Sequence, residues 1–187
     1  SSRRMNHDLR HHMITLQGFL QGGRVQDACD YLEQYLDSAR QVELVELCRN
    51  PVVNMVVGHY RSLALHKDIQ FQPRIQVPDQ LSVSDIDLSV ILGNLLENAL
   101  DASRKLTPDQ RQIRVMVRML SPAMLGIVVE NRYDGVLKKQ SGILHSTKHE
   151  GIGIGLVSIE TAVRKYNGDL TVETKNNVFR ANVLLNL

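Results

Sequence analysis

Residues 6–13, NHDLRHHM, hold three histidines, an aspartate and an arginine within eight positions. His7 and His11 have the spacing of two zinc ligands one helical turn apart, and Asp8 stands where a zinc hydrolase carries its general base. The same residues suit another chemistry, in which an imidazole accepts a phosphoryl group while the neighbouring carboxylate orients the ring and takes its proton. The motif alone leaves both chemistries open.

The surrounding pattern favours an exposed imidazole over a metal site. A zinc site needs a third protein ligand, and the remaining histidines are scattered outside any recognised zinc motif. The apolar residues of 5–20 recur at a helical period, and a helical wheel puts His7 and His11 opposite the apolar stripe and His12 on it. We therefore expect His7 to face solvent, where a nucleophile can meet another domain, and His12 to pack inside.

Two helices are predicted in the first part of the chain. The segment QGG at 21–23 predicts a turn, and a second amphipathic helix should cover about 24–39. Residues 1–48 would then form a helical hairpin. Because two such helices bury little apolar surface, we expect the hairpin to pair with a second copy in a four-helix bundle, which makes the protein a homodimer.

The composition excludes several classes of protein. Apolar residues make up 43% of the chain, and the net charge of +2 is too near neutral to indicate a nucleic-acid surface. Cys29 and Cys48 have no partner at metal spacing, which is typical of a reduced, intracellular protein. No apolar run reaches the roughly 18 residues of a membrane span. We expect a cytoplasmic fragment whose full-length form carries an N-terminal membrane sensor region.

Residues 51–187 show an α+β pattern with mostly antiparallel strands and helices on one face. Asn50-Pro51 predicts a helix start, and Pro73 predicts that its alternating strand lies at a sheet edge. The predicted elements are helices at about 51–66, 84–105 and 155–166, a strand at 69–77, and hairpins over 112–131 and 168–186.

The long helix has a polar face opposite its apolar stripe. Asn94, Asn98 and Asp101 share that face with Glu97, and a merely solvated surface is one interpretation. Two asparagines are mediocre helix formers, however, which points to a use for them. The Asn98 oxygen suits Mg²⁺, which accepts one or two protein oxygens and takes the rest from phosphates and water.

Three glycines, Gly151, Gly153 and Gly155, come before the next predicted helix. A dinucleotide fingerprint needs a glycine where this chain has Leu156, and it also needs a preceding strand. The Gly-Lys-Ser/Thr ending of a P-loop is absent as well. The glycines therefore form either a tight turn or a loop whose backbone N–H groups bind an anion at the helix N-terminus.

Together, NLLENALDA at 94–102 and GIGIGL at 151–156 resemble the N box and second glycine box of the GHKL ATPase superfamily, which includes histidine kinases. The segment NHDLRHHM, placed in a helical hairpin, resembles the phosphoacceptor region of sensor histidine kinases. It looks closest to the peptide-sensing accessory-gene-regulator type, whose acceptor is a His-Asp pair. The resemblance covers nearly the whole chain.

This resemblance implies a Bergerat-type α/β two-layer sandwich over 51–187 that binds ATP between the long helix and a lid. Asn98 matches the Mg²⁺ ligand, Asn94 matches the other N-box amide, and Asp101 lies on the same face. The glycines Gly151, Gly153 and Gly155 match the hinge and phosphate loop. Lys148, in the lid, could meet phosphate oxygens, and an ordinary solvated lysine is the alternative.

One position departs from the superfamily. Most members carry an aspartate that reads the adenine amino group, and this chain has Asn131 there, within ENRYDG. The asparagine carbonyl can still accept a hydrogen bond from that amino group, although without the charge. We therefore expect ATP binding.

The implied function is that of the cytoplasmic core of a two-component kinase. Mg-ATP would give its γ-phosphoryl group to His7, with Asp8 as base or orienter, and the phosphohistidine would serve an aspartate of a response regulator. His11 stands where many such kinases carry an Asn or Thr linked to dephosphorylation of the partner, so that activity stays open. The alternatives are a phosphotransfer scaffold that binds no ATP and a zinc hydrolase.

Overall fold

The computed structural model describes residues 2–34, 45–135 and 154–187, with side chains described from Arg10 and, in the last range, from Leu156. The chain divides into two compact units, Ser1–Val42 and Glu43–Leu187. Within the described ranges, no helix has both the length and the apolar character that crossing a membrane requires. The domain boundaries expected from the sequence, 1–48 and 51–187, stay a prediction.

The first unit contains α1 (Ser2–Gln21) and α2 (Val25–Glu33). Gly23 adopts a positive φ of 70° in the turn between them, which glycine tolerates without strain. His12 Nδ1 and the Tyr31 hydroxyl share a hydrogen bond of 2.8 Å, which joins the two helices. The second helix was expected to run to about residue 39, and the part from 35 onward lies outside the described residues.

Several apolar side chains of these two helices stay exposed within the unit. The exposed apolar side chains of this unit are Met13, Ile14, Leu20, Val25 and Leu32. His12, expected on the stripe, is partly buried, and His11, expected opposite it, is exposed. Pairing with a second copy in a four-helix bundle stays a prediction.

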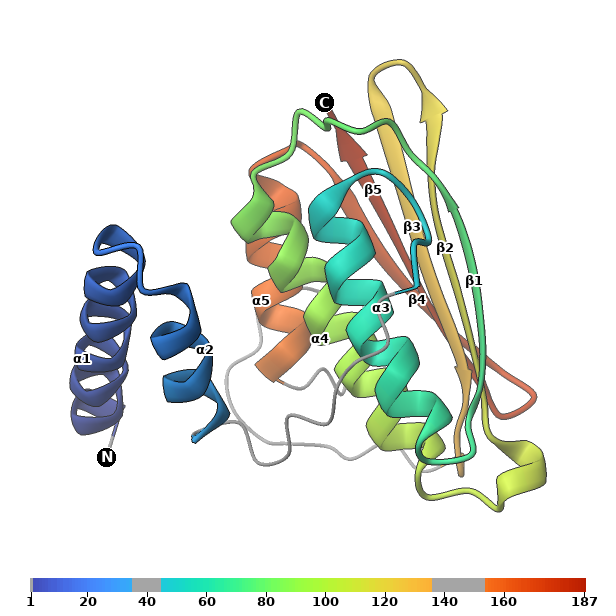
Figure 1. Cartoon of the computed structure of the whole chain (residues 1–187). Coiled ribbons are helices and arrows are strands. Elements are labelled where there is room, and N and C mark those ends of the chain that lie inside the picture. Colours follow the sequence, from blue (N-terminus) through green and yellow to red (C-terminus); the bar gives the residue numbers. More distant parts are fainter. Residues whose placement is uncertain (1, 35–44, 136–153) are drawn as a thin grey trace. The chain divides into compact units, whose positions relative to one another are not determined.

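The second unit is a five-stranded sheet with one helix layer (Figure 1). Its strands are β1 (Gln70–Gln76), β2 (Gln112–Ser121), β3 (Met124–Arg132), β4 (Asp169–Lys175) and β5 (Val178–Asn186). They lie in the order β1-β2-β3-β5-β4, with β1 parallel to β2 and all other neighbours antiparallel. The α+β class and the mostly antiparallel pairing are thereby confirmed.

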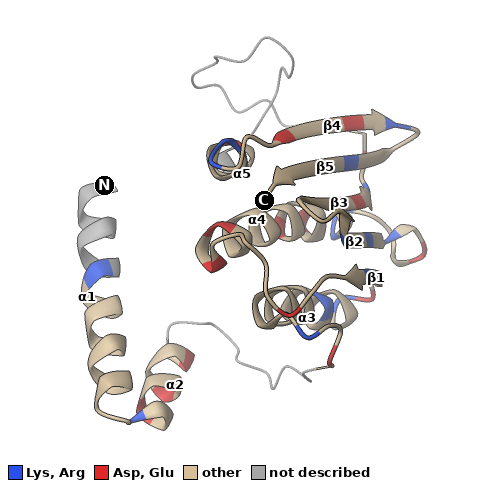
Figure 2. Ribbon diagram, turned by 90° about the horizontal axis from the view of Figure 1, so that it is seen from above, with Lys and Arg blue, Asp and Glu red and all other residues tan. Residues whose placement is uncertain are grey.

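Both edges of the sheet carry residues that discourage further pairing. Pro73 lies in the edge strand β1, as predicted, and has no N–H to donate. The other edge strand, β4, contains three charged residues, Asp169, Glu173 and Lys175, whose positions are coloured on the ribbon in Figure 2. Asn176 and Asn177 both adopt positive φ, at 53° and 59°, in the turn between β4 and β5. This is the backbone that a two-residue hairpin turn requires, and asparagine tolerates it.

The helix layer covers one face of the sheet (Figures 1 and 2). It consists of α3 (Pro51–Leu65), α4 (Asp85–Ser103) and α5 (Ile154–Arg164). The Asn50 side chain caps α3 by accepting a hydrogen bond of 3.0 Å from Val53 N. The central helix α4 buries a stripe against the sheet that consists of Leu88, Ile91, Leu92, Leu95, Leu96, Ala99 and Leu100. The three helices predicted in this unit and the apolar stripe predicted for α4 are confirmed.

A polar cluster ties the start of α4 to the end of α5. Asp87, only 7% exposed, accepts hydrogen bonds from Lys165 Nζ at 2.6 Å and from the Tyr166 hydroxyl at 2.9 Å. The same hydroxyl accepts a hydrogen bond of 2.9 Å from Ser84 N, at the N-cap of α4. Because the N-terminus of one helix is joined to the C-terminus of the other, α4 and α5 are antiparallel.

The Asp87 cluster should make stability depend on pH. The hydrogen bonds that Lys165 and Tyr166 donate lower the pKa of Asp87 below its ordinary 3.8, and donating to Asp87 raises the pKa of Lys165 above its ordinary 10.5. The stabilisation is therefore present at neutral pH and lost as the pH falls through the lowered pKa of Asp87. We expect Asp87→Asn to lower the thermal midpoint at pH 7, with a deficit that shrinks toward about pH 3. An equal deficit at both pH values would show that ionisation of Asp87 contributes nothing.

A second prediction concerns Gly168, which precedes β4. A Cβ at this position would collide with the backbone carbonyl oxygen of Leu184 and lie 2.9 Å from a Val163 methyl group. We expect Gly168→Ala to lower the free energy of unfolding by about 3 kcal/mol, measured by urea denaturation. Gly58, inside α3, is the matched control because a Cβ there meets nothing within 4 Å. Gly58→Ala should stabilise by about 1 kcal/mol, and losses of equal size in the two variants would contradict the argument.

Candidate functional site

The antiparallel packing of α4 and α5 brings two predicted site segments to one level. Asn98 lies 11 residues after Asp87 along α4, and Ile154 lies 11 residues before Lys165 along α5. At a rise of about 1.5 Å per residue, both positions are about 16 Å from the Asp87 cluster. The N-terminus of α5 therefore lies beside the part of α4 that carries Asn98.

The end of β3 lies at the same end of the unit. The chain leaves α4 and enters β2 through residues 104–111, where Arg111 donates to the backbone carbonyls of Leu106 at 2.9 Å and Lys67 at 2.8 Å. Ile113, at the start of β2, pairs with Asn131 near the end of β3. The three segments singled out from the sequence thus converge, although they are distant along the chain.

The polar face of α4 is where the sequence predicts it. Glu97, Asn98 and Asp101 are exposed, and Asn94 is partly buried. The Asn94 amide nitrogen donates to the Val90 carbonyl at 2.8 Å, and this hydrogen bond does not use its Oδ1, which can accept another. Two amide and two carboxylate groups therefore line one side of the convergence.

The charge of this face suits a hard cation. A triphosphate beside the carboxylates of Glu97 and Asp101 would be repelled, and Arg104, 3.4 Å from Asp101, is the basic partner on the same helix. A divalent cation between the phosphates and α4 would reverse that repulsion, and an all-oxygen donor set fits Mg²⁺. The described residues hold no group of three or more His, Cys, Asp or Glu that could bind a metal by itself. A cation here would therefore share its ligands with phosphate.

A tyrosine from α3 also reaches the polar face. The Tyr60 hydroxyl donates a 2.9 Å hydrogen bond to Glu97 Oε2. Burial, followed by the hydrogen bond with Glu97, raises the pKa of Tyr60, so the hydroxyl keeps its proton at neutral pH. The sequence analysis missed this residue because a single tyrosine forms no motif. Tyr60 lies seven residues after the buried Val53, so both are on the same face of α3. This spacing could have predicted that Tyr60 faces the packed side of the helix.

Asn131 is 3% exposed and points to the helix side of the sheet. Its Nδ2 donates a hydrogen bond of 2.9 Å to the Arg132 carbonyl. Its Oδ1 is not used in that hydrogen bond and can act as an acceptor. Phe179 lies directly opposite on β5, and its ring meets that of Tyr133 edge-on at 6.4 Å. A buried amide acceptor beside aromatic rings suits a flat, hydrogen-bonding ligand.

The remaining predicted residues are only partly described. Gly155 lies in the first turn of α5, where free backbone N–H groups and the helix dipole favour an anion. Lys148, Gly151 and Gly153 lie outside the described residues. His7 and Asp8 belong to α1 in the other unit, and their side chains are not among those described, so the zinc alternative stays open there.

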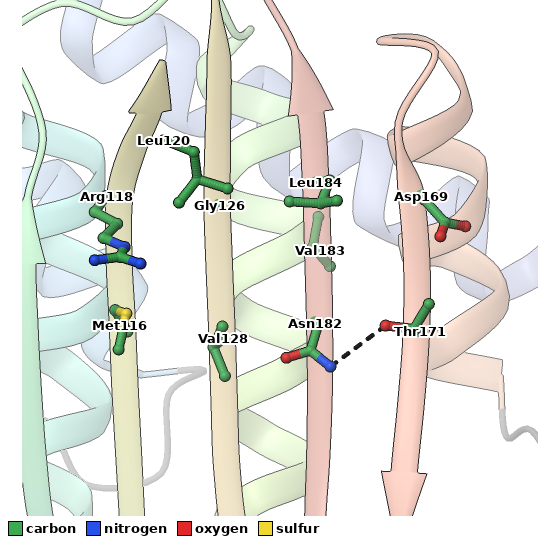
Figure 3. A pocket seen from close by; sticks show the side chains of 10 residues that line it. All are labelled: Met116, Arg118, Leu120, Gly126, Val128, Asp169, Thr171, Asn182, Val183 and Leu184. Carbon is green, nitrogen blue, oxygen red and sulfur yellow. Dashed lines mark hydrogen bonds between the residues drawn. The ribbon is translucent and has the colours of Figure 1, made fainter.

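A pocket on the opposite face of the sheet is a separate feature. Figure 3 shows Met116, Val128 and Leu184 around Gly126, where the missing side chain leaves room that Leu120 partly fills. Its volume of about 260 Å³ is smaller than that of typical small-molecule sites, at roughly 300–1,000 Å³. None of the predicted site residues lines it.

The family model described as GHKL domain matches residues 83–186, which is more than half of the chain. The protein therefore belongs to the GHKL domain family. The match includes α4, Asn131 and the whole of α5, and it begins after α3.

Similar proteins fit this assignment. A probable C4-dicarboxylate sensor kinase of Halalkalibacterium halodurans is 25% identical over 94% of the chain, and the sensor histidine kinase CitA of Klebsiella pneumoniae is 26% identical over 94%. The chain spans about a third of the length of these curated relatives, 35% and 34%. The catalytic domain of the histidine kinase ThkA shares the fold, with a TM-score of 0.57 and 16% identity over 73% of this chain and 92% of that one.

Proposed function

We propose that the protein is the catalytic core of a two-component sensor histidine kinase. One observation carries the proposal: the amide- and carboxylate-bearing face of α4 meets the N-terminus of α5 and the end of β3, inside a GHKL domain. The similarity to sensor kinases supports it. In this proposal ATP is the phosphoryl donor and His7, in the N-terminal unit, is the acceptor.

The chemistry follows from the residues that would surround the phosphates. Asn98 would bind Mg²⁺ together with the phosphates, with Asn94 and the two carboxylates of α4 nearby on the same face, and the cation would offset the charge of the phosphates. The free N–H groups at the start of α5, with Gly151 and Gly153 before it and Gly155 in its first turn, would hold phosphate oxygens. Lys148 would add a positive charge from the lid.

In the transfer step, a nitrogen of His7 attacks the γ-phosphorus. The bond between that phosphorus and the bridging oxygen breaks, so ADP leaves with the electron pair, and Asp8 accepts the imidazole proton or orients the ring. The phosphoryl group would then pass to an aspartate of a response regulator. Phosphoryl transfer depends mainly on positioning and charge stabilisation. In this proposal, the His7 nitrogen would therefore have to come close to the γ-phosphorus of the bound ATP in each cycle.

The other assignments of this proposal concern the whole protein. A homodimer would form through the uncovered apolar stripe of α1 and α2, in a four-helix bundle. The full-length protein would carry an N-terminal membrane sensor region and keep this part on the cytoplasmic side. The accessory-gene-regulator type rests on the His7-Asp8 pair alone and stays a prediction.

Asn131 favours a second candidate function, a phosphotransfer scaffold whose GHKL domain no longer binds ATP. A neutral amide gives adenine a weaker hydrogen bond than a carboxylate would. The two functions separate in a calorimetric titration with Mg-ATP, where a scaffold gives no heat of binding.

One prediction of the proposed function concerns the phosphoacceptor residue. Incubation with γ-labelled ATP should label the wild-type chain with phosphate that is lost in acid, as phosphohistidine is. His7→Gln should abolish the label, while His11→Gln, one turn away on the same helix, should keep it. Retention of the full label in His7→Gln would remove this residue from the mechanism.

Another prediction of the proposed function concerns Asn131. Replacing it with aspartate should strengthen ATP binding about tenfold, because hydrogen bonds to a charged acceptor are stronger by about 1.4 kcal/mol. The same variant should unfold more easily without nucleotide, since it buries an uncompensated carboxylate. Calorimetry and thermal unfolding measure the two effects. An unchanged ATP affinity would mean that this side chain does not meet the base.

A further inference from the structure

Tyr60 contacts the candidate ATP site from outside the matched family region. It belongs to α3, and the GHKL match begins only at residue 83. Its hydroxyl is hydrogen-bonded to Glu97, which stands next to Asn98 and four residues before Asp101. The contact joins residues 37 apart in the chain, so it is a tertiary contact and not a local one.

The hydrogen bond restricts the Glu97 carboxylate without using it up. Tyr60 donates to Oε2 only, and an ionised carboxylate can accept about four hydrogen bonds. Glu97 is exposed, so its other carboxylate oxygen is open to solvent, and the residue is the chain neighbour of Asn98 on the polar face of α4. The negative charge of Asp101 also raises the pKa of Tyr60, after burial and the Glu97 carboxylate.

A fixed carboxylate beside a magnesium ligand has a defined use. Mg²⁺ keeps several of its waters, and those waters are strong hydrogen-bond donors. An exposed glutamate left to itself would rotate freely, and its repulsion from Asp101 at i+4 would turn it away. One hydrogen bond donated by Tyr60 restricts that rotation, because the tyrosine is partly buried and packs against the hydrophobic core.

We propose that Tyr60 is a positioning residue for the cation site: it holds Glu97 so that the free carboxylate oxygen accepts hydrogen bonds from water on the Mg²⁺ that Asn98 would bind. This inference rests on the proposed function, since it assumes that a magnesium nucleotide binds there. It adds α3 to the elements that build the site. Groups that hold first-shell ligands or waters around a metal change its affinity by about 10- to 100-fold.

The test compares nucleotide binding with and without magnesium. Calorimetric titrations of the whole chain with the non-hydrolysable β,γ-imido analogue of ATP are run in MgCl₂ and in EDTA. Tyr60→Phe removes only the hydroxyl. We expect it to weaken binding about tenfold with magnesium, and to leave the affinity in EDTA unchanged.

Two further variants separate positioning from a structural role. Glu97→Gln keeps an acceptor for Tyr60 but loses the charge. We expect it to weaken binding with magnesium, with no added loss in the double variant. In EDTA it should bind at least as tightly as the wild type, because one carboxylate that repels the phosphates is gone. Tyr166→Phe is the matched control, because it also removes a tyrosine hydroxyl that donates to a carboxylate of α4, at the other end of the helix. It should lower the thermal midpoint and leave the magnesium dependence as in the wild type.

The outcomes are decisive. Equal weakening of Tyr60→Phe in both buffers would make the contact merely structural and overturn the inference, and so would an unchanged affinity in magnesium. If the wild-type chain binds no nucleotide in either buffer, the proposed kinase function fails and the inference fails with it. That result is distinct, because it appears before any variant is compared.

Discussion

The candidate site depends on how α4 and α5 are held against each other. Asp87, Lys165 and Tyr166 join the two helices at one end, and the apolar stripe of α4 fixes them on the sheet along their length. With that end fixed, helix geometry alone brings the N-terminus of α5 level with Asn98. No residue of the Asp87 cluster lies in the candidate site. The cluster nevertheless determines which groups of α4 and α5 lie close enough to contact the same ligand.

The same helix serves the core and the site. A stripe of leucine, isoleucine and alanine on α4 packs on the sheet, which leaves its opposite face free to carry Asn94, Glu97, Asn98 and Asp101. Polar groups on a rigid element are positioned more accurately than groups on a loop. The phosphates would depend less on side-chain positions, because the backbone N–H groups at the start of a helix already favour an anion.

The elements were predictable from the sequence because each has a local signature. Asn50-Pro51 announced the start of α3, alternation predicted the strands, and Pro73 predicted an edge, all of which the structure confirms. The polar face of α4 was predictable for the same reason. The contacts of Tyr60 with Glu97 and of Lys165 with Asp87 span 37 and 78 residues, and no local pattern encodes them. They follow only once the sheet order and helix packing are known.

The distribution of charge across the site gives it a particular dependence on a cation. At the base-reading position the chain carries the neutral Asn131, while Glu97 and Asp101 add negative charge on α4, where the phosphates would lie. In the proposed function, the base would therefore contribute less binding free energy than it would with an aspartate, and the phosphates would contribute little until a cation offsets the carboxylates. Such a site would bind the magnesium complex of a nucleotide in preference to the free nucleotide. The carboxylates that repel the bare phosphates are also the groups that would hold the cation and its water. The same side chains would therefore make nucleotide binding depend on a cation and help to bind that cation.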